Sequence, residues 1–206
     1  MNKMQYKFTE EELFHTWLTS DDHFYHENII RLCGRPFKDA EEMNEKLIDN
    51  WNRVVGKEDI VFNLGDFAFA SGYQKWKDII DRLNGKIVLI KGNHEQKNMK
   101  PTVEELFYHV TYQMQIEAGD YSVYLNHYPF LCYGGSYREK PVLQAFGHVH
   151  THEGGNGLDD HRMKYLFPTQ YDVGVDNNNF TPISLKKFIE IIEQQIQLDK
   201  HEVQNI

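Results

Sequence analysis

The chain has 206 residues, 40% of them hydrophobic, which is enough to bury one core and too few for two domains of ordinary size. Its formal net charge of −9 argues against binding along an extended nucleic-acid backbone, because such binding neutralises many phosphates with Lys and Arg. Its two cysteines, Cys33 and Cys132, lack C-x-x-C spacing, so we expect ordinary thiols and neither a disulfide framework nor a structural zinc cluster.

The N-terminal segment, MNKMQYKFTEEELF, carries acidic residues where a signal peptide would need an apolar stretch. No apolar run approaches the roughly 20 residues that a membrane-spanning helix requires. No internal repeat and no linker rich in Pro, Gly and Ser divides the sequence. We therefore expect a single cytoplasmic domain, residues 1–206, that does not engage a membrane.

The first predicted elements are a strand and a helix. An apolar run from His15 to Thr19 ends at Ser20-Asp21, which predicts a buried strand with polar residues at its carboxyl end. Asp39 and Glu42 have the spacing of a capping box, which predicts the start of a helix. Apolar residues then recur at helical spacing until Gly56 offers a stop: Met43, Leu47, Trp51 and Val54.

Two further strands follow, with a second helix between them. Ile60–Leu64 leads into Gly65-Asp66, and Lys86–Ile90 leads into the sequence Gly92-Asn93-His94-Glu95. The helix between them is marked by Trp76, Ile79, Ile80 and Leu83 and stops near Asn84-Gly85. Strands and helices in alternation predict a largely parallel sheet, and ligands of such sheets gather beyond the carboxyl ends of the strands.

The second half of the chain has a different pattern. Thr111–Ile116 and Tyr121–Leu125 flank Ala118-Gly119-Asp120, which predicts an antiparallel hairpin with Asn126-His127 at its exit. Further strands are expected at Gln144–Gly147 and Asp172–Val175. Pro182 and Ser184 open a C-terminal helix whose apolar face carries Leu185, Phe188, Ile189, Ile192 and Ile196.

Polar clusters stand at the ends of five predicted strands. They are Asp21-Asp22-His23, Gly65-Asp66, Gly92-Asn93-His94-Glu95, Asn126-His127 and Gly147-His148-Val149-His150. Carboxylate, carboxamide and imidazole without thiolate suit manganese, iron, zinc or nickel, and do not suit an all-sulfur zinc site or a calcium cage. Asp21 and His23 can reach one ion if their backbone stays extended, and His148 and His150 share that spacing. A glycine before three of the clusters lets the chain turn sharply and approach an ion closely.

These motifs, D-x-H, G-D, G-N-H-E, H and G-H-x-H in that order, resemble the calcineurin-like metallophosphoesterase superfamily. The resemblance spans Asp21 to His150, and the tail Gly174-Val175-Asp176-Asn177 with Pro182 is similar to small single-domain members of bacterial and phage type. It implies an α/β fold, a four-layer α-β-β-α sandwich of two mixed sheets flanked by helices.

The resemblance also implies roles for the matching residues, all of which have the expected type. The first metal ion would take Asp21, His23 and His150, and the second would take Asn93, His127 and His148. Asp66 would bridge both ions, and His94 would be a catalytic residue that is not a ligand. The cofactor implied is a pair of divalent metal ions, manganese first, with iron, zinc or nickel as alternatives.

Departures from the superfamily patterns disfavour two of its branches. Phe67-Ala68-Phe69 follows Asp66 where the protein Ser/Thr phosphatases of this superfamily carry a further Asp and Arg, which disfavours that branch. The sequence also lacks the capping and DNA-binding domains of the double-strand-break nucleases of this superfamily, which disfavours a DNA-repair nuclease. Glu95 stands where many relatives have Asp, so its role is open.

The expected activity is hydrolysis of a small, soluble, nucleotide-like phosphodiester by metal-activated hydroxide. A phosphomonoesterase acting through the same site and a catalytically silent metal-binding scaffold are the alternatives. A nuclease acting on polynucleotide ends is a third, disfavoured by the acidic composition. The expected partner is a small phosphorylated substrate, and the sequence leaves the oligomeric state open.

Substrate contacts are predicted from four residues near these clusters: His26, Asn28, Arg35 and Arg162. For the first three, the alternative is a surface position or support of a ligand. Arg162 belongs to a polar segment, residues 153–165, that reads as a loop beside the site, with a solvated loop as the alternative. His152 is expected at the rim, and Tyr133–Arg138 is expected to form a turn at the cleft.

Overall fold

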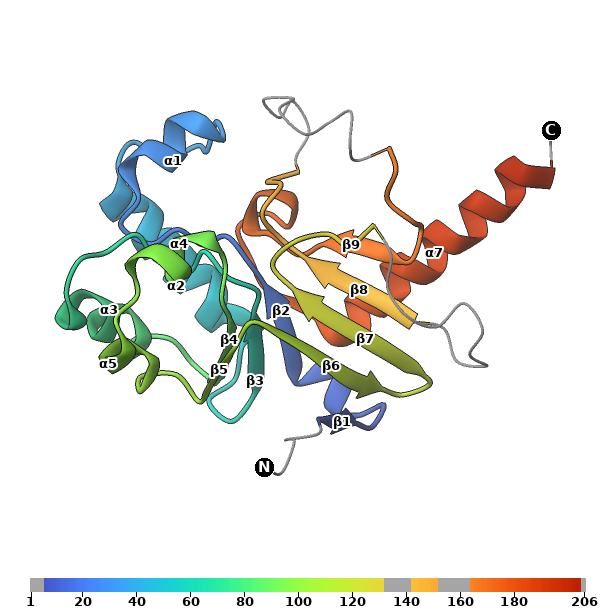
Figure 1. Cartoon of the computed structure of the whole chain (residues 1–206), viewed down its shortest axis with the longest axis horizontal. Helices are drawn as coiled ribbons and strands as arrows, with labels where there is room; N and C mark the ends of the chain where they lie inside the picture. Colours follow the sequence, from blue (N-terminus) through green and yellow to red (C-terminus); the bar gives the residue numbers. More distant parts are fainter. Residues whose placement is uncertain (1–5, 132–141, 152–163, 205–206) are drawn as a thin grey trace.

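The computed structural model describes residues 6–131, 142–151 and 164–204, and these residues form two five-stranded sheets (Figure 1). The first sheet has the strand order β10 (Ile183–Ser184), β2 (Thr16–Thr19), β3 (Ile60–Asn63), β4 (Lys86–Ile90) and β5 (His109–Thr111). The second has the order β1 (Lys7–Phe8), β6 (Gln113–Ala118), β7 (Tyr121–Asn126), β8 (Val142–Phe146) and β9 (Gln170–Asp172).

Both sheets are mixed. In the first sheet β2, β3, β4 and β5 run parallel, and only the edge strand β10 is antiparallel. In the second sheet β6 and β7 form the predicted antiparallel hairpin, while β7, β8 and β9 run parallel. The carboxyl ends of the parallel strands of both sheets come together, because the segment after β2 pairs with the segment after β9 through a bridge between Ser20 and Gly174.

The helices are α1 (Glu27–Leu32), α2 (Ala40–Val54), α3 (Tyr73–Ile80), α4 (Asn93–Asn98), α5 (Pro101–Glu104) and α7 (Leu185–Gln204), with two short 3-10 turns, η1 (Glu12–Phe14) and η2 (Val175–Asn177). The predicted helix start at Asp39 is confirmed, because the Asp39 side chain accepts a hydrogen bond from the Glu42 amide. The reciprocal half of the capping box does not form, since the Glu42 carboxylate accepts from the Lys38 amide and not from the Asp39 amide. Among the described helices none is long and apolar enough for a membrane span.

The outer face of the first sheet is covered by α2 and α3. Period-2 alternation points Val61, Ile87 and Leu89 toward this side, where they pack with apolar side chains of the two helices. Trp51 of α2 and Trp76 of α3 are both 1% exposed in this cluster. Full burial of side chains of this size stabilises the fold by about 1.5–3 kcal/mol each.

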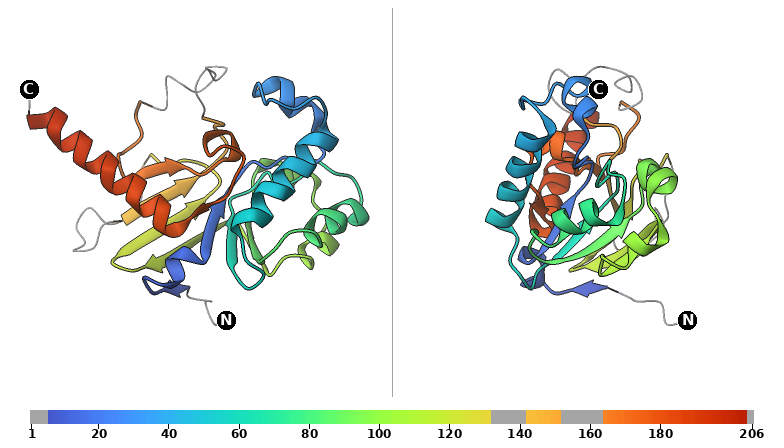
Figure 2. Two further views of the ribbon diagram at one scale, coloured as in Figure 1. Left: turned by 180° about the vertical axis from the view of Figure 1, so that it is seen from behind. Right: turned by 90° about the vertical axis from the view of Figure 1, so that its left-hand side faces the viewer.

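The inner face of the first sheet packs on the second sheet. Phe62 of β3, for example, meets Phe8 of β1 edge to face, with 6.0 Å between ring centroids. Helix α7 contacts the same face of the second sheet, through Phe188 against Tyr171, and it runs across the strands when the molecule is seen from behind (Figure 2). The predicted two mixed sheets flanked by helices are therefore confirmed.

Several predicted boundaries were wrong by one to three residues, and two of them have a clear structural outcome. The strand expected at Asp172–Val175 is β9, which ends at Asp172, because the Asp172 carboxylate accepts a hydrogen bond from the Gly174 amide and turns the chain into η2. The helix expected to continue to Leu83 ends at Ile80. The turn predicted at residues 133–138 lies outside the described residues.

Candidate metal centre

Polar side chains from five strand ends converge on one carboxylate oxygen, Oδ2 of Asp66. Three imidazole nitrogens lie close to it: His127 Nε2 at 3.6 Å, His23 Nε2 at 3.7 Å and His94 Nε2 at 3.8 Å. Asp66 follows β3, and these histidines follow β7, β2 and β4. The site therefore forms where the carboxyl ends of both sheets meet, as the strand-end pattern predicted.

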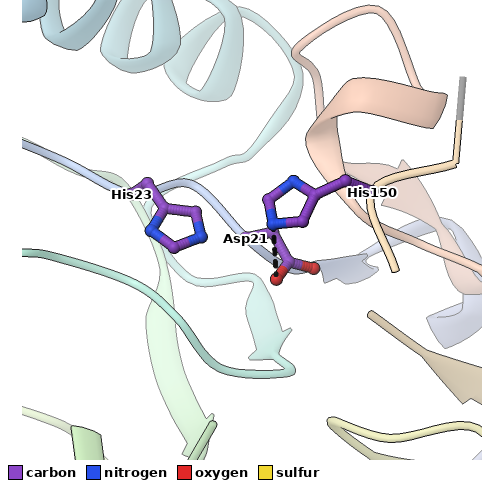
Figure 3. A group of neighbouring side chains, drawn as sticks. All are labelled: Asp21, His23 and His150. Atoms are coloured by element: carbon purple, nitrogen blue, oxygen red, sulfur yellow. Dashed lines mark ion pairs between the residues drawn. The ribbon is translucent and has the colours of Figure 1, made fainter. Parts of the chain in front are cut away.

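A second group surrounds the Asp21 carboxylate, beyond the end of β2. His150 Nε2 lies 3.7 Å from Asp21 Oδ1, and the rings of His23 and His150 stack with 5.2 Å between centroids. In Figure 3 a dashed line marks the ion pair between His150 and Asp21, and the His23 ring, from a separate segment, lies beside the His150 ring. The ligand atoms of these three side chains lie within 4.8 Å of one another, as do those of Asp66, His127 and His148.

In both Asp66 and Asp21, one carboxylate oxygen is held by a backbone amide and the other faces the imidazole rings. Asp66 Oδ1 accepts a hydrogen bond from the His94 amide at 2.9 Å, and Asp21 Oδ2 accepts one from the His148 amide at 2.9 Å. Backbone donors therefore hold both side chains in position. The remaining oxygens, Asp66 Oδ2 and Asp21 Oδ1, face the imidazole nitrogens.

The outer nitrogens of two histidines are held by acceptors, which sets the tautomer of each ring. His127 Nδ1 donates to the Leu64 carbonyl at 2.8 Å, and His150 Nδ1 donates to Asp176 Oδ2 at 2.7 Å. The Nε2 of His127 then presents its lone pair to the centre, and the Nε2 of His150 does so when its ring is neutral. The Nε2 of His127 lies 3.1 Å from the Asn93 carboxamide oxygen, so two electron-pair donors face each other.

The donor set fits divalent metal ions. Asp21 Oδ1 and His23 Nε2 are buried and have no hydrogen-bond partner among the described residues, although buried polar atoms are nearly always paired. A cation would satisfy both atoms and would also separate the facing donors of Asn93 and His127. The set consists of oxygen and nitrogen donors, which suits the transition-metal ions expected from the sequence.

The electrostatics of the protein without metal point the same way. Burial, with the nearby carboxylates of Asp21 and Glu95, raises the pKa of Asp66 to about 8. Burial, with the positive charge of His150, lowers the pKa of His23 well below its ordinary value. The pKa of His150 is raised in spite of its burial, because Asp21 and Asp176 favour its charged form. Such opposed shifts within one cluster are typical of functional sites.

The expected extended backbone at the ligand pairs was wrong. Strand β2 ends at Thr19, and Asp21 and His23 have φ values of 60° and 55°. His148 and His150 have φ values of 73° and 50°. Left-handed backbone is unfavourable for residues with a Cβ and persists where the surrounding structure enforces it, most often at functional sites. Asp21 and His23 therefore reach one donor group through left-handed turns, whereas His148 and His150 belong to different groups.

The glycines of the motifs allow close packing between neighbouring loops. Gly65 has φ 100°, and a Cβ there would lie 2.7 Å from Cα of Gly92. A Cβ on Gly92 would collide with the Asp66 carboxylate, and one on Gly147 would collide with Ser20 and the carboxylate of Asp21. The missing Cβ atoms thus make room for the carboxylates and the adjoining loop. The expectation was that these glycines would let the chain approach an ion, whereas the contacts they allow are with protein atoms.

Glu95 joins two strand-end loops. Its buried carboxylate accepts hydrogen bonds from the amides of Asp66 at 2.8 Å, Phe67 at 2.8 Å and Gly92 at 2.9 Å. The role that the sequence left open is therefore to hold the loop that follows β3 against the loop that follows β4.

The substrate contact predicted for Arg35 does not agree with its position. Its guanidinium is fully buried and forms hydrogen bonds from Nε and Nη2 to the two oxygens of Asp176, both at 2.8 Å. It also donates to the backbone carbonyls of Asp21 and Asp22. Because Asp176 holds His150, Arg35 positions the metal centre and is not available to a substrate. The sequence motif at residues 174–177 includes Asp176, but its pattern alone indicated no role for this residue.

The other predicted substrate residues have different surroundings. His26 is buried, and its Nδ1 lies 3.1 Å from Nδ1 of His23, which places it behind a ligand. Asn28 is exposed on α1. Arg162, His152 and most of the loop expected at residues 153–165 lie outside the described residues. His94 is 25% exposed and reaches the centre from the first turn of α4, where a substrate can touch it.

Comparisons with known proteins agree with this geometry. The chain is 36% identical over 180 residues to an uncharacterized protein of Methanocaldococcus jannaschii, covering 86% of this chain and 91% of the relative. It is 32% identical to the Gene 66 protein of Mycobacterium phage L5, over 56% of this chain and 64% of that protein. A crystal structure of a protein of unknown function from Aquifex aeolicus superposes with a TM-score of 0.66 at 27% identity, covering 85% of this chain and 98% of that one.

The family assignment rests on a match that spans most of the chain. The sequence model described as calcineurin-like phosphoesterase covers residues 14–192, which include every strand end of the candidate metal centre. The chain therefore belongs to the calcineurin-like phosphoesterase family.

Proposed function

We propose that this protein is a dinuclear metal-dependent hydrolase of a small, soluble, nucleotide-like phosphodiester, acting in the cytoplasm. The observation that carries the proposal is the sharing of Asp66. Its Oδ2 lies within 3.6–3.8 Å of His127, His23 and His94, and the group around Asp21 adjoins it through His23. One carboxylate shared between two donor groups supports a site for two metal ions.

The donor groups divide between the two ions. Asp21, His23 and His150 would hold the first, while Asn93, His127 and His148 would hold the second, with Asp66 between them. Manganese is the favoured ion, and iron, zinc or nickel would suit the same donors. When bound, the ions would supply a hydroxide nucleophile at neutral pH and offset negative charge on the phosphoryl oxygens.

The protein's own residues orient the substrate and handle its protons. Asp66 must be ionised to bridge the two ions. Because its pKa is raised to about 8 in the absence of metal, binding of the ions at neutral pH must displace its proton. His94 contacts the centre while staying 25% exposed. It is placed to bind a phosphoryl oxygen or to protonate the departing alkoxide.

The first test compares two chromogenic esters. The protein is purified with manganese, and hydrolysis of bis-p-nitrophenyl phosphate is compared with that of p-nitrophenyl phosphate, with Asp66→Ala as the control. Faster turnover of the diester that is lost in the variant supports the proposal. Faster turnover of the monoester would replace it with a phosphatase. No turnover of either ester, with two ions bound per chain, would favour a silent scaffold.

His94→Asn separates catalysis from metal binding. Because His94 is assigned no ligand role, the variant should bind metal as tightly as the wild type while kcat falls by about 10²- to 10⁴-fold. Metal content is measured by elemental analysis and kcat with the preferred ester. Full turnover in this variant would remove His94 from the mechanism.

A further inference from the structure

An exposed aromatic ring stands beside the candidate catalytic histidine. Phe69 lies three residues after Asp66 and is 45% exposed, although its neighbours Phe67 and Ala68 are buried. Its backbone is fixed, since the Phe69 amide donates to the Phe24 carbonyl at 2.8 Å and Ala68 pairs with Phe24 in a β-bridge. The ring is therefore held at the rim of the site by a defined backbone.

The contacts of this ring connect it to the centre. His26 stacks on Phe69 with 4.4 Å between centroids and an interplanar angle of 22°, so one face of the ring is covered. The His94 ring meets Phe69 edge to face, with 5.4 Å between centroids. Since His94 in turn lies 3.8 Å from Asp66 Oδ2, Phe69 is one ring removed from the metal centre.

A cavity of about 340 Å³ adjoins Phe69. It is lined by Phe69, Ala70, Ser71, Gly72, Tyr73, Trp76, Lys100 and Val103, and lies where α3 and α5 meet. Its size is at the lower end of the range of about 300–1,000 Å³ for small-molecule sites. It suits one planar ring system and its substituents. Lys100 supplies a cation to this lining, in a chain whose formal net charge is −9.

We propose that this cavity and the adjoining face of Phe69 form a subsite for the aromatic part of the leaving group, a nucleobase. The proposal rests on the proposed function and names its substrate class. If His94 serves the departing oxygen, the leaving group extends past His94 toward Phe69. A base would stack on the ring, and Lys100 would donate to an acceptor atom on its edge.

The discriminating probes are adenosine and thymidine, which carry no phosphate and so cannot be hydrolysed by a phosphoesterase. Their Kd is measured by NMR titration of the manganese-free protein. Phe69→Leu keeps an apolar side chain and removes the stacking surface, so the tighter nucleoside should bind about tenfold more weakly. Phe69→Tyr retains the surface and should restore the wild-type Kd.

Phe14→Leu is the matched control, because Phe14 is also an exposed phenylalanine, at 56%, and lies on η1. It should leave the Kd unchanged. The subsite is overturned if neither nucleoside binds the wild type at millimolar concentration, or if Phe69→Leu and Phe14→Leu behave alike. Circular dichroism of each variant establishes that it is folded.

This experiment and the ester assay fail independently. Nucleoside binding that depends on Phe69, without ester hydrolysis, would support the subsite and count against the proposed function. Hydrolysis of the diester without nucleoside binding would leave the phosphoesterase in place and exclude the nucleobase subsite.

Discussion

The two sheets contribute differently to the centre. The segments after β2, β3 and β4 of the first sheet supply both carboxylates, Asp21 and Asp66, together with His23 and Asn93. The segments after β7 and β8 of the second sheet supply imidazoles only: His127, His148 and His150. Neither sheet carries a full set of donors for either candidate ion. The packing of one sheet on the other is therefore what assembles the centre.

The supports of the two halves also differ. On the first-sheet side, backbone amides and the Glu95 carboxylate fix the loops. On the second-sheet side, acceptors fix the rings: the Leu64 carbonyl holds His127, and Asp176 holds His150. Substitutions on the first-sheet side should consequently lower stability, and those on the second-sheet side should lower metal affinity.

The largest effect is expected where the two halves meet. Asp66→Ala removes the oxygen that both donor groups share, so metal content should fall for both ions and turnover should fall to background. Isothermal titration with manganese measures the stoichiometry. Retention of one tightly bound ion would show that the halves are independent and that Asp66 is not a bridge.

The next effect tests the first-sheet side. Glu95→Ala would leave the buried amides of Asp66, Phe67 and Gly92 without an acceptor, at about 1–3 kcal/mol each. We expect the free energy of unfolding to fall by about 3 kcal/mol or more, measured by urea denaturation. Glu105→Ala, at an exposed position in the same part of the chain, is the matched control and should change it little.

A smaller and more selective effect is expected on the second-sheet side. Asp176→Asn weakens the acceptor that orients His150, so affinity for the ion held with Asp21 should fall about 10- to 100-fold. The ion held with His127 should keep its affinity, which a two-site titration resolves. Asp199→Asn, at an exposed position, should leave both affinities unchanged. Equal losses at both sites would contradict the division into two halves.

The smallest effect is the pH dependence of the metal-free protein. The pKa of Asp66 is raised by burial to about 8, so the folded state keeps a proton that the unfolded state loses near pH 4. The folded state therefore loses stability from this group as the pH rises from about 4 to 8. With chelator present, the urea concentration at the unfolding midpoint should decrease as the pH is raised from 6 to 8. The midpoint of Asp66→Asn should decrease less over the same range. An equal decline in both proteins would assign the effect to other groups.

Much of the fold could be predicted from local patterns. Period-2 and helical spacing located α2, the three parallel strands β2–β4 and the hairpin of β6 and β7, because burial of an apolar face imposes those periods. The N-cap at Asp39 was predicted from an equally local pattern, whereas the reciprocal bond of the capping box did not form. The boundary at Asp172 was missed, since there a side chain turns the chain in the midst of an apolar run.

The sequence by itself indicated which polar clusters would lie together, because donors that follow neighbouring parallel strands meet where those strands end. Only the tertiary structure decided how they meet. The left-handed backbone at Asp21 and His148, and the burial of Arg35 against Asp176, depend on contacts between segments far apart in the chain. Local propensity disfavours the left-handed backbone, since a residue with a Cβ avoids positive φ. It gives no information on the burial of Arg35 against Asp176. The physical reason is that packing of the two sheets enforces both.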